Sequence, residues 1–303
     1  MISIQEYPVA DAAAGPYAVT TGPDGALWFT MVHSGQIGRL IPGQAPTVYQ
    51  IDAQSGPSII VTGPDRALWF TEYTAHRIGR VTTDGDVTEF SLPTPECGPF
   101  GIATGPDDAL WFTETAADRI GRITIDGTIT EFPLPMAGAF PSAIAAGPDG
   151  GMWFTLNQAN AIGRIGPDGA VSVHPIPTPS AAPVGVTAGP DGAVWFVEIA
   201  AGQIGRITPD GTVVEFALPD RGARPHAITA GADGDLWFTE WGGNRIGRIT
   251  VEGRLEEHDL PTPGSEPHGI TRTPDGALWV ALETGALARI VADRGSAGTV
   301  RPQ

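Results

Sequence analysis

Short apolar runs alternate with glycine, proline and aspartate turns along the whole chain, and this alternation repeats. Four runs recur in a fixed order: one after a Gly-Pro or x-Pro pair, one containing Trp-Phe, one of the form Ile-Gly-Arg-Ile and one of the form Val-Thr-Glu-Phe. Short runs bounded by turn residues are typical of β-strands. One tryptophan marks each repeat, at Trp28, Trp69, Trp111, Trp153, Trp195, Trp237 and Trp279.

The spacing of these tryptophans predicts the fold. A period of about 40 residues that contains four short strands is typical of one blade of a β-propeller. Seven repeats therefore predict an all-β, seven-bladed β-propeller with four-stranded blades, in which the Trp-Phe rings fill the space between neighbouring blades. The glycine of the third run should allow close approach of an adjacent sheet. Because the repeats use almost all of the 303 residues, we expect residues 1–303 to form a single domain.

The two ends of the chain complement each other. After Ala288-Arg289-Ile290 the last repeat has no Val-Thr-Glu-Phe strand, whereas Ile4-Gln5-Glu6-Tyr7-Pro8 at the start is similar to one. We expect residues near 2–8 to form the outer strand of the last blade, which would close the ring and cover an exposed sheet edge. Residues from about 294 to 303 are predicted to be a loose tail.

Composition removes several classes of function. The net charge is −17, and all 17 basic residues are arginine. An acidic protein does not suit nucleic acid or an anionic membrane surface, and a chain without lysine cannot form a lysine Schiff base. Cys97 is the single cysteine, so no internal disulfide is possible. The start does not resemble a signal peptide and no apolar stretch approaches the ~18 residues of a membrane span. We expect a soluble, monomeric, cytoplasmic protein.

Positions at which the repeats differ indicate where function lies. The residues that follow the proline opening each first strand are Tyr17, Ser58, Phe100, Ser142, Val184, His226 and His268. Tyr17, His226 and His268 belong to blades one, six and seven, which become neighbours when the ring closes. We expect these three side chains to converge at one mouth of the central channel. The other histidines, His33, His76, His174 and His258, show no such pattern, and we assign them to surface or loop roles.

The acidic residues can be sorted in the same way. Glu72, Glu114, Glu198 and Glu240 all follow the Trp-Phe-Thr/Val triplet, so we interpret them as structural. Glu266 replaces a position held elsewhere by Gly15, Gly56, Gly98, Phe140, Ala182 and Arg224, and Glu283 lies one step beyond the repeat position. Two carboxylates beside imidazoles could hold Mg²⁺; the alternative is solvated loop glutamates. Arg224 could bind a carboxylate or carbonyl group, or lie at the surface.

The residues that depart from the repeat are similar to those of a known family. Ser265-Glu266-Pro267-His268-Gly269, Arg224-Pro225-His226-Ala227, Gly15-Pro16-Tyr17 and Leu282-Glu283 resemble the virginiamycin B lyase (streptogramin B lyase) family, and the similarity runs over all seven blades. The resemblance implies a Mg²⁺-dependent carbon–oxygen lyase that linearises streptogramin B type cyclic depsipeptides, such as virginiamycin B and quinupristin, at the threonine ester and so gives antibiotic resistance. It implies His268 as proton acceptor, His226 and Tyr17 as substrate contacts, and Glu266 and Glu283 as metal ligands.

Two other readings remain open. A metal-dependent lactonase or esterase could also work at a propeller mouth. Such sites use Asn and Asp, however, and neither occurs in the column of equivalent first-strand positions that contains His268. A non-catalytic peptide-binding propeller would instead use exposed aromatic residues such as Trp241 or Tyr73. The chain has no convincing Ser-His-Asp arrangement, which favours elimination over a reaction that needs an activated nucleophile.

Overall fold

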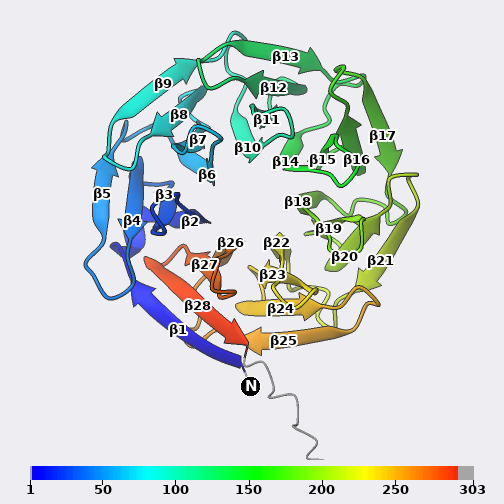
Figure 1. Ribbon diagram of the computed structural model, residues 1–303. Helices are drawn as coiled ribbons and strands as arrows, with labels where there is room; N and C mark the ends of the chain where they lie inside the picture. Colours follow the sequence, from blue (N-terminus) through cyan, green and yellow to red (C-terminus); the bar gives the residue numbers. More distant parts are fainter. Residues whose placement is uncertain (1, 293–303) are drawn as a thin grey trace, which may run out of the picture.

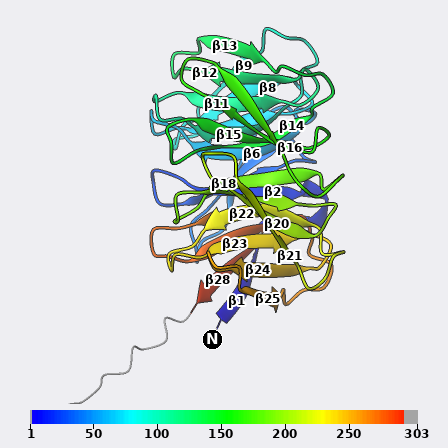
Figure 2. The ribbon, with the colours of Figure 1, turned by 90° about the vertical axis from the view of Figure 1, so that its right-hand side faces the viewer.

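The computed structural model describes residues 2–292, and these form seven four-stranded antiparallel sheets arranged in a ring (Figure 1). This confirms the expected seven-bladed β-propeller. Seen edge-on, the ring has its connecting loops on two opposite faces (Figure 2). The expected loose tail, residues 294–303, lies outside the described residues. Among the described residues, no helix has the length and apolar character needed to cross a membrane.

Each blade contains four strands in the same order from the channel outward. The inner strands are β2 (Pro16–Thr21), β6 (Pro57–Thr62), β10 (Pro99–Thr104), β14 (Pro141–Ala146), β18 (Pro183–Ala188), β22 (Pro225–Ala230) and β26 (Pro267–Arg272). The second strands are β3 (Leu27–Met31), β7 (Leu68–Glu72), β11 (Leu110–Glu114), β15 (Met152–Leu156), β19 (Val194–Glu198), β23 (Leu236–Glu240) and β27 (Leu278–Leu282).

The two remaining strands of each blade lie toward the rim. The third strands are β4 (Gln36–Leu40), β8 (Arg77–Val81), β12 (Arg119–Ile123), β16 (Ala161–Ile165), β20 (Gln203–Ile207), β24 (Arg245–Ile249) and β28 (Ala286–Ala292). The outer strands are β5 (Thr47–Gln50), β9 (Val87–Ser91), β13 (Ile129–Pro133), β17 (Val171–Pro175), β21 (Val213–Ala217), β25 (Leu255–Asp259) and β1 (Ile2–Pro8). A short 3₁₀ helix, Ala12–Ala14, connects β1 to β2.

The ring is closed by the N-terminal strand, as the sequence predicts. Strand β1 pairs antiparallel with β28 in the order β1-β28-β27-β26 (Figure 1). Its Glu6 accepts hydrogen bonds from the backbone N–H of Thr262, at 3.2 Å, and from the Thr262 hydroxyl. Glu131 on β13 holds Thr94 of the preceding blade in the same way. The first strand therefore makes the same inter-blade contact that an internal outer strand makes.

The Trp-Phe rings fill the spaces between blades, also as predicted. Trp28 of blade one packs in one buried cluster with Phe70 of blade two, and Trp69 packs with Phe112 of blade three. The glycine of the third strand has a different role from the one expected. A Cβ atom at Gly121 would lie 2.1 Å from the ring of Phe112, which belongs to the paired strand of the same blade. Glycine here makes room for a ring of its own sheet and not for an adjacent sheet.

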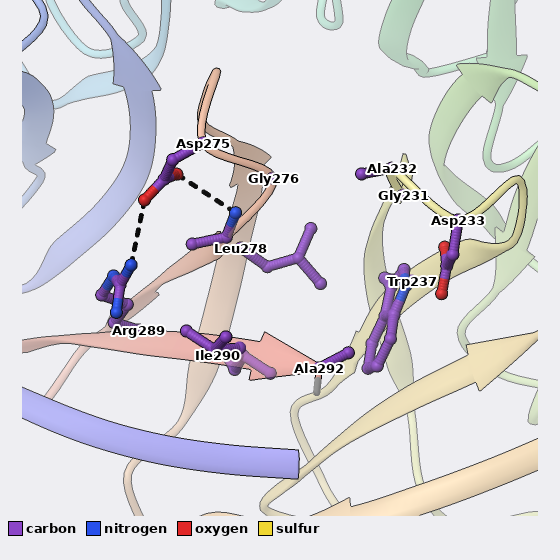
Figure 3. Close-up of a pocket in the computed structure, with 12 residues that line it drawn as sticks. Gly231, Ala232, Asp233, Trp237, Asp275, Gly276, Leu278, Arg289, Ile290 and Ala292 are labelled. Atoms are coloured by element: carbon purple, nitrogen blue, oxygen red, sulfur yellow. Dashed lines mark hydrogen bonds and ion pairs between the residues drawn. The ribbon is translucent and has the colours of Figure 1, made fainter. Parts of the chain in front are cut away.

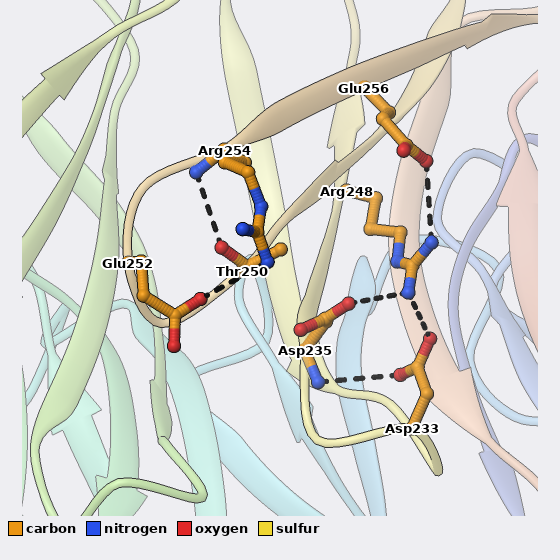
Figure 4. A network of polar contacts seen from close by, with 7 residues as sticks. All are labelled: Asp233, Asp235, Arg248, Thr250, Glu252, Arg254 and Glu256. Atoms are coloured by element: carbon orange, nitrogen blue, oxygen red, sulfur yellow. Dashed lines mark hydrogen bonds and ion pairs between the residues drawn. The ribbon is translucent and has the colours of Figure 1, made fainter.

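The repeated aspartates and arginines stabilise the face opposite to the proline-led strand starts. In blade one, Asp24 accepts hydrogen bonds from Trp28 Nε1 at 3.1 Å and from Arg39 Nε at 2.7 Å, and the Arg39 guanidinium lies over the indole ring. In blade six the corresponding Arg248 pairs with two aspartates of the facing turn (Figure 4). These charged residues are therefore part of the scaffold.

A pocket of about 380 Å³ on this same face lies between blades six and seven (Figure 3). Its acidic side chains are Asp233 and Asp275, and they are paired with Arg248 and Arg289 at 3.0 and 2.9 Å. Both carboxylates are therefore engaged by arginines of the fold and are not free to bind a ligand.

Candidate active site

A bulge at the start of each inner strand determines which side chains reach the channel mouth. In blade seven Pro267 pairs with Leu282, but the next register partners are Ile270 and Val280, so the residues between them leave the regular ladder. His268 lies in this bulge. Such bulges redirect side chains, often beside functional sites. The same shift occurs in the other inner strands, which explains why this column of the repeat faces the mouth.

The structure brings Tyr17, His226 and His268 together. The Tyr17 hydroxyl lies 3.2 Å from His226 Nε2. The His268 ring centroid lies 4.5 Å from that of Tyr17 and 4.7 Å from that of His226. Thr239 joins blade six to blade seven. Its hydroxyl accepts a hydrogen bond from the N–H of Ala227 in blade six at 3.0 Å and donates one to the carbonyl of His268 in blade seven at 2.8 Å. Three rings from blades one, six and seven thus form one cluster.

Burial keeps two members of this cluster neutral. It raises the pKa of the Tyr17 phenol, and the negative charge of Glu283 adds to the effect. Burial, together with the neighbouring His268, lowers the pKa of His226 to about 3. A protonated phenol and a neutral imidazole share this hydrogen bond, and its direction follows the tautomer of His226. The pair is therefore a neutral, rigid wall of the site.

Glu283 is the charged centre of the cluster and joins blades seven and one. One of its carboxylate oxygens contacts His268 Nε2, and the other lies 2.7 Å from His33 Nε2. The hydrogen bond from His268 outweighs the opposing effect of burial and, with that from His33, lowers the pKa of Glu283 to about 2. The carboxylate is therefore ionised, and it holds one imidazole on each side.

His33 corrects a sequence-based assignment. It lies in the loop between β3 and β4, as expected, but its contact with Glu283 places it in the site and not merely at the surface. Gly15 makes room for it, since a Cβ atom there would lie 2.3 Å from His33 Cδ2. A signal was available: in the equivalent position the other blades carry Thr74, Ala116, Gln158, Ala200, Gly242 and Thr284. His33 breaks that column in the blade next to blade seven.

Glu266 and Arg224 flank the cluster. The Glu266 carbonyl accepts from the Glu283 N–H at 3.2 Å, so the two glutamates stand on adjacent segments, and the Glu266 side chain is exposed. The Arg224 guanidinium lies 5.2 Å from the ring centroid of Trp241, which is itself 6.4 Å from that of His268. Arg224 therefore stacks on an aromatic ring at the edge of the site.

Glu266 and Glu283 are the acidic residues at the mouth that could hold a metal ion. In the described part of the chain no group of three or more His, Cys, Asp or Glu side chains is arranged to hold a metal ion. Mg²⁺ needs less, since it is often held by one or two carboxylates and keeps several waters. Glu283 is ionised and Glu266 is exposed beside it. Carboxylates are the donors that a hard divalent ion prefers, and Glu266 and Glu283 are the residues that would supply them; both Glu283 oxygens contact imidazoles in this structure.

A pocket of about 500 Å³ opens beside the cluster. His33 and Glu283 line one side, and Tyr73, Phe100 and Phe140 from blades two to four line much of the rest. Below it, the inner strands enclose a channel space of about 270 Å³ that Tyr17 and His226 also line. The mouth can therefore hold a ligand against the Glu283 carboxylate.

The residues assigned to structural roles lie away from this pocket lining. Glu72, Glu114, Glu198 and Glu240 are fully buried at the ends of their second strands. The ring of His174 stacks on Trp153 at 5.8 Å, and that of His258 stacks on Trp237 at 6.2 Å. His76 Nδ1 accepts from the Gly98 N–H at 3.2 Å in a loop contact.

Comparison with known proteins gives a consistent set of matches. The model of the virginiamycin B lyase family matches residues 2–290. A virginiamycin B lyase of Saccharopolyspora erythraea is 64% identical over 95 residues, which is 31% of this chain and spans only 32% of that relative's length. The solved virginiamycin B lyase from Staphylococcus aureus is 42% identical, covers 96% of this chain and 100% of its own, and has a TM-score of 0.92. A catalytically inactive form of the Staphylococcus aureus enzyme with quinupristin has a TM-score of 0.93.

Proposed function

The chain belongs to the virginiamycin B lyase family, and from this premise we propose that it is a carbon–oxygen lyase that linearises streptogramin B type cyclic depsipeptides. The observation that carries the proposal is the pairing of His268 with the ionised Glu283 beside a pocket at the channel mouth. A relative of the same fold over its full length was solved with quinupristin, a ligand of this class.

His268 acts as the general base. In the neutral ring Nε2 carries a proton and donates it to the carboxylate of Glu283, a residue that lines the pocket. We assign to this imidazole the removal of the α-proton of the threonine that bears the ester oxygen. The Glu283 carboxylate then pairs with the imidazolium that forms and stabilises it. The electrons of the broken C–H bond form a Cα–Cβ double bond, the Cβ–O bond breaks, and the carboxylate departs without addition of water.

Tyr17 and His226 position the substrate in this scheme. Their pKa shifts keep both side chains uncharged, so they present polar but neutral groups beside the base. Neither competes with His268 for the substrate proton, because a phenol with a raised pKa is protonated and an imidazole with a pKa of about 3 is a weak base. This assigns binding to Tyr17 and His226, and proton transfer to His268.

Glu266 and Glu283 would hold Mg²⁺ as oxygen ligands. When bound, a divalent ion polarises an ester carbonyl and stabilises a departing carboxylate. Removing divalent ions with a chelator should abolish linearisation, and adding Mg²⁺ should restore it. Calorimetric titration of Mg²⁺ into the wild type and the Glu266→Gln variant checks the ligand assignment independently of activity.

The product distinguishes elimination from hydrolysis. An elimination adds no atoms, so the linear product should have the mass of the cyclic antibiotic and carry a dehydrated threonine unit. A metal-dependent esterase would add one water. In ¹⁸O-labelled water, mass spectrometry should find no label in the released carboxylate. Label at that position would overturn the lyase proposal.

The same activity should protect a cell. We propose that the protein acts as a monomer in the cytoplasm, where linearisation of the antibiotic gives resistance. Expression in a sensitive bacterium should raise the inhibitory concentration of quinupristin, and the His268→Ala variant should not. Equal protection by both forms would show that the protein resists the antibiotic by some other means, such as sequestration.

A further inference from the structure

One position of the repeat carries an unusual backbone conformation in every blade. This position lies two residues before His268 and before its equivalents in the other blades. Its backbone has the left-handed conformation, with φ between 51° and 67°. Blades one to three place glycine there, which adopts this conformation freely. Blades four to seven place side chains there, in the order Phe140, Ala182, Arg224 and Glu266. A bulky residue at positive φ is a strained outlier, and such strain often occurs at functional sites.

The three larger side chains of this strained column all lie at the mouth. Glu266 stands beside Glu283, and Arg224 stacks on Trp241 next to His268. Phe140, with φ 53°, lines the 500 Å³ pocket. Two of the three are thus already part of the site's surroundings, and the third faces the same space from blade four, across the ring from blades seven and one (Figure 1).

Packing of the fold does not explain the Phe140 ring. In the described part of the chain, the buried clusters between blades do not include it. Its backbone is held by Asp118, whose carboxylate accepts from the N–H groups of Gly138, Ala139 and Phe140 at 2.7, 2.8 and 3.3 Å. The scaffold therefore holds this backbone, as Asn160 and Asn244 do at the equivalent places of later blades, and the ring is not part of the buried clusters.

The other aromatic residues that line the pocket indicate what the Phe140 ring would bind. Phe100 lies 6.3 Å from Tyr73 and 6.2 Å from Tyr17 between ring centroids, both in edge-to-face arrangements. These rings form a wall that leads from the His268 cluster toward blade four, and Val184 of blade five adds an apolar surface. Aromatic rings prefer such edge-to-face and offset partners. The end of the pocket away from Glu283 is thus suited to an aromatic group.

We propose that Phe140, with Phe100 and Tyr73, forms a subsite that binds an aromatic side chain of the cyclic depsipeptide, and that Phe140 is a specificity-determining residue. The inference rests on the proposed function and deepens it. The ester would then lie at the His268 and Glu283 end of the pocket, and the aromatic side chain would hold the ring of the depsipeptide in register with the base.

The glycines of blades one to three provide a sharp test. Phe140→Gly removes the ring and relieves the left-handed strain, so the variant should unfold at the same or a higher temperature than the parent. Its affinity for quinupristin should nevertheless fall by about tenfold, the upper range for an aromatic contact. Ala182→Gly is the matched control: it relieves the same conformation, with φ 51°, at a residue that does not line the pocket. Its affinity for quinupristin should not change.

Binding and catalysis are measured separately. Calorimetric titration of quinupristin into the His268→Ala protein, with and without each glycine substitution, tests the subsite, and turnover by the His268 forms tests the lyase activity. Binding that Phe140→Gly weakens and Ala182→Gly does not supports the subsite, even if no elimination occurs. Equal binding by both variants, destabilisation by Phe140→Gly, or no binding by the parent would overturn it.

Discussion

Single side chains at the mouth owe their charge states to where the fold buries them. Tyr17 and His226 stay neutral because burial disfavours their charged forms, whereas Glu283 stays charged because two imidazoles hydrogen-bond to it. In the proposed mechanism these opposite shifts separate substrate binding from proton transfer, because neighbouring titratable residues then hold different charges.

Replacing the proposed base should remove most of the turnover. His268→Ala should lower the rate of linearisation by about 10²–10⁴-fold, the usual contribution of a general base. The melting temperature should change little. Steady-state kinetics with quinupristin and calorimetry of unfolding check both. Near-normal turnover would move the base to another residue of the cluster.

His33 should matter because it holds the second oxygen of Glu283. His33→Ala removes the 2.7 Å contact and should reduce activity by about 10–100-fold, the usual effect of losing a partner that orients a metal ligand, which is the role proposed for Glu283. His33→Gln should recover part of the loss if its amide can still donate to the carboxylate. His174→Ala is the control, since this imidazole stacks on Trp153 in an outer strand. Equal effects of the two alanine variants would show that His33 has no special role.

At the scale of strands, the repeat uses one set of contacts to join blades and to close the ring. An outer-strand glutamate holds the threonine of the preceding Leu/Ile-Pro-Thr-Pro loop in blades three and five, and Glu6 does so in blade seven. Closure therefore depends on the same charge-assisted hydrogen bonds that hold internal blades together. The bulge in each inner strand then decides which residues reach the mouth.

The contributions of the Glu6 and Glu131 contacts to the free energy of unfolding should be similar. Glu6→Ala and Glu131→Ala should each lower the free energy of unfolding by about 1–2 kcal/mol, because each removes a carboxylate that accepts two hydrogen bonds. Urea denaturation of both variants gives the comparison. If Glu6→Ala had no effect while Glu131→Ala destabilised the protein, the closing strand would not use this contact.

For the whole molecule, buried glutamates make stability depend on pH. Burial, with a neighbouring glutamate, raises the pKa of Glu114 to about 8, and burial raises that of Glu198 to about 7. Burial raises the pKa values of Glu72 and Glu240 as well. Between the unfolded value near 4.5 and these folded values, the folded protein holds protons that the unfolded chain releases. Rising pH therefore favours unfolding over this range.

Aspartates act in the opposite direction at lower pH. Burial opposes ionisation of Asp24, but the hydrogen bonds from Arg39 and Trp28 outweigh it and lower the pKa of Asp24. The stability that this aspartate contributes is present above about pH 4, the ordinary value for Asp, and is lost as pH falls through the folded pKa. The two effects together place the highest stability near pH 5.

Melting temperatures measured from pH 4 to 8 check this profile. They should be highest near pH 5 and decline toward pH 8. Glu114→Gln should reduce the decline, because it removes a carboxyl group whose ionised form is disfavoured by burial, and should change little at pH 5. Glu252→Gln is the control, since Glu252 is exposed and pairs with Arg254 at the surface (Figure 4). A decline of unchanged size in Glu114→Gln would place its origin elsewhere.

The sequence by itself determined the architecture, because each blade repeats the same local pattern. The seven tryptophans set the number of blades, and the similarity of Ile4-Gln5-Glu6-Tyr7-Pro8 to the missing last strand set the closure. Comparison of repeats also singled out His268 and Glu283. Local periodicity and turn residues suffice for such inferences, since they depend on neighbours along the chain.

Only the tertiary structure decided how the site is connected. The contact between His33 and Glu283 joins residues 250 positions apart, and it exists because closure of the ring sets blade one beside blade seven. The opposite pKa shifts of His226 and Glu283 likewise depend on burial and on partners from other blades. The third-strand glycines accommodate a ring of their own sheet because side-chain packing, which the repeat pattern does not encode, places it there.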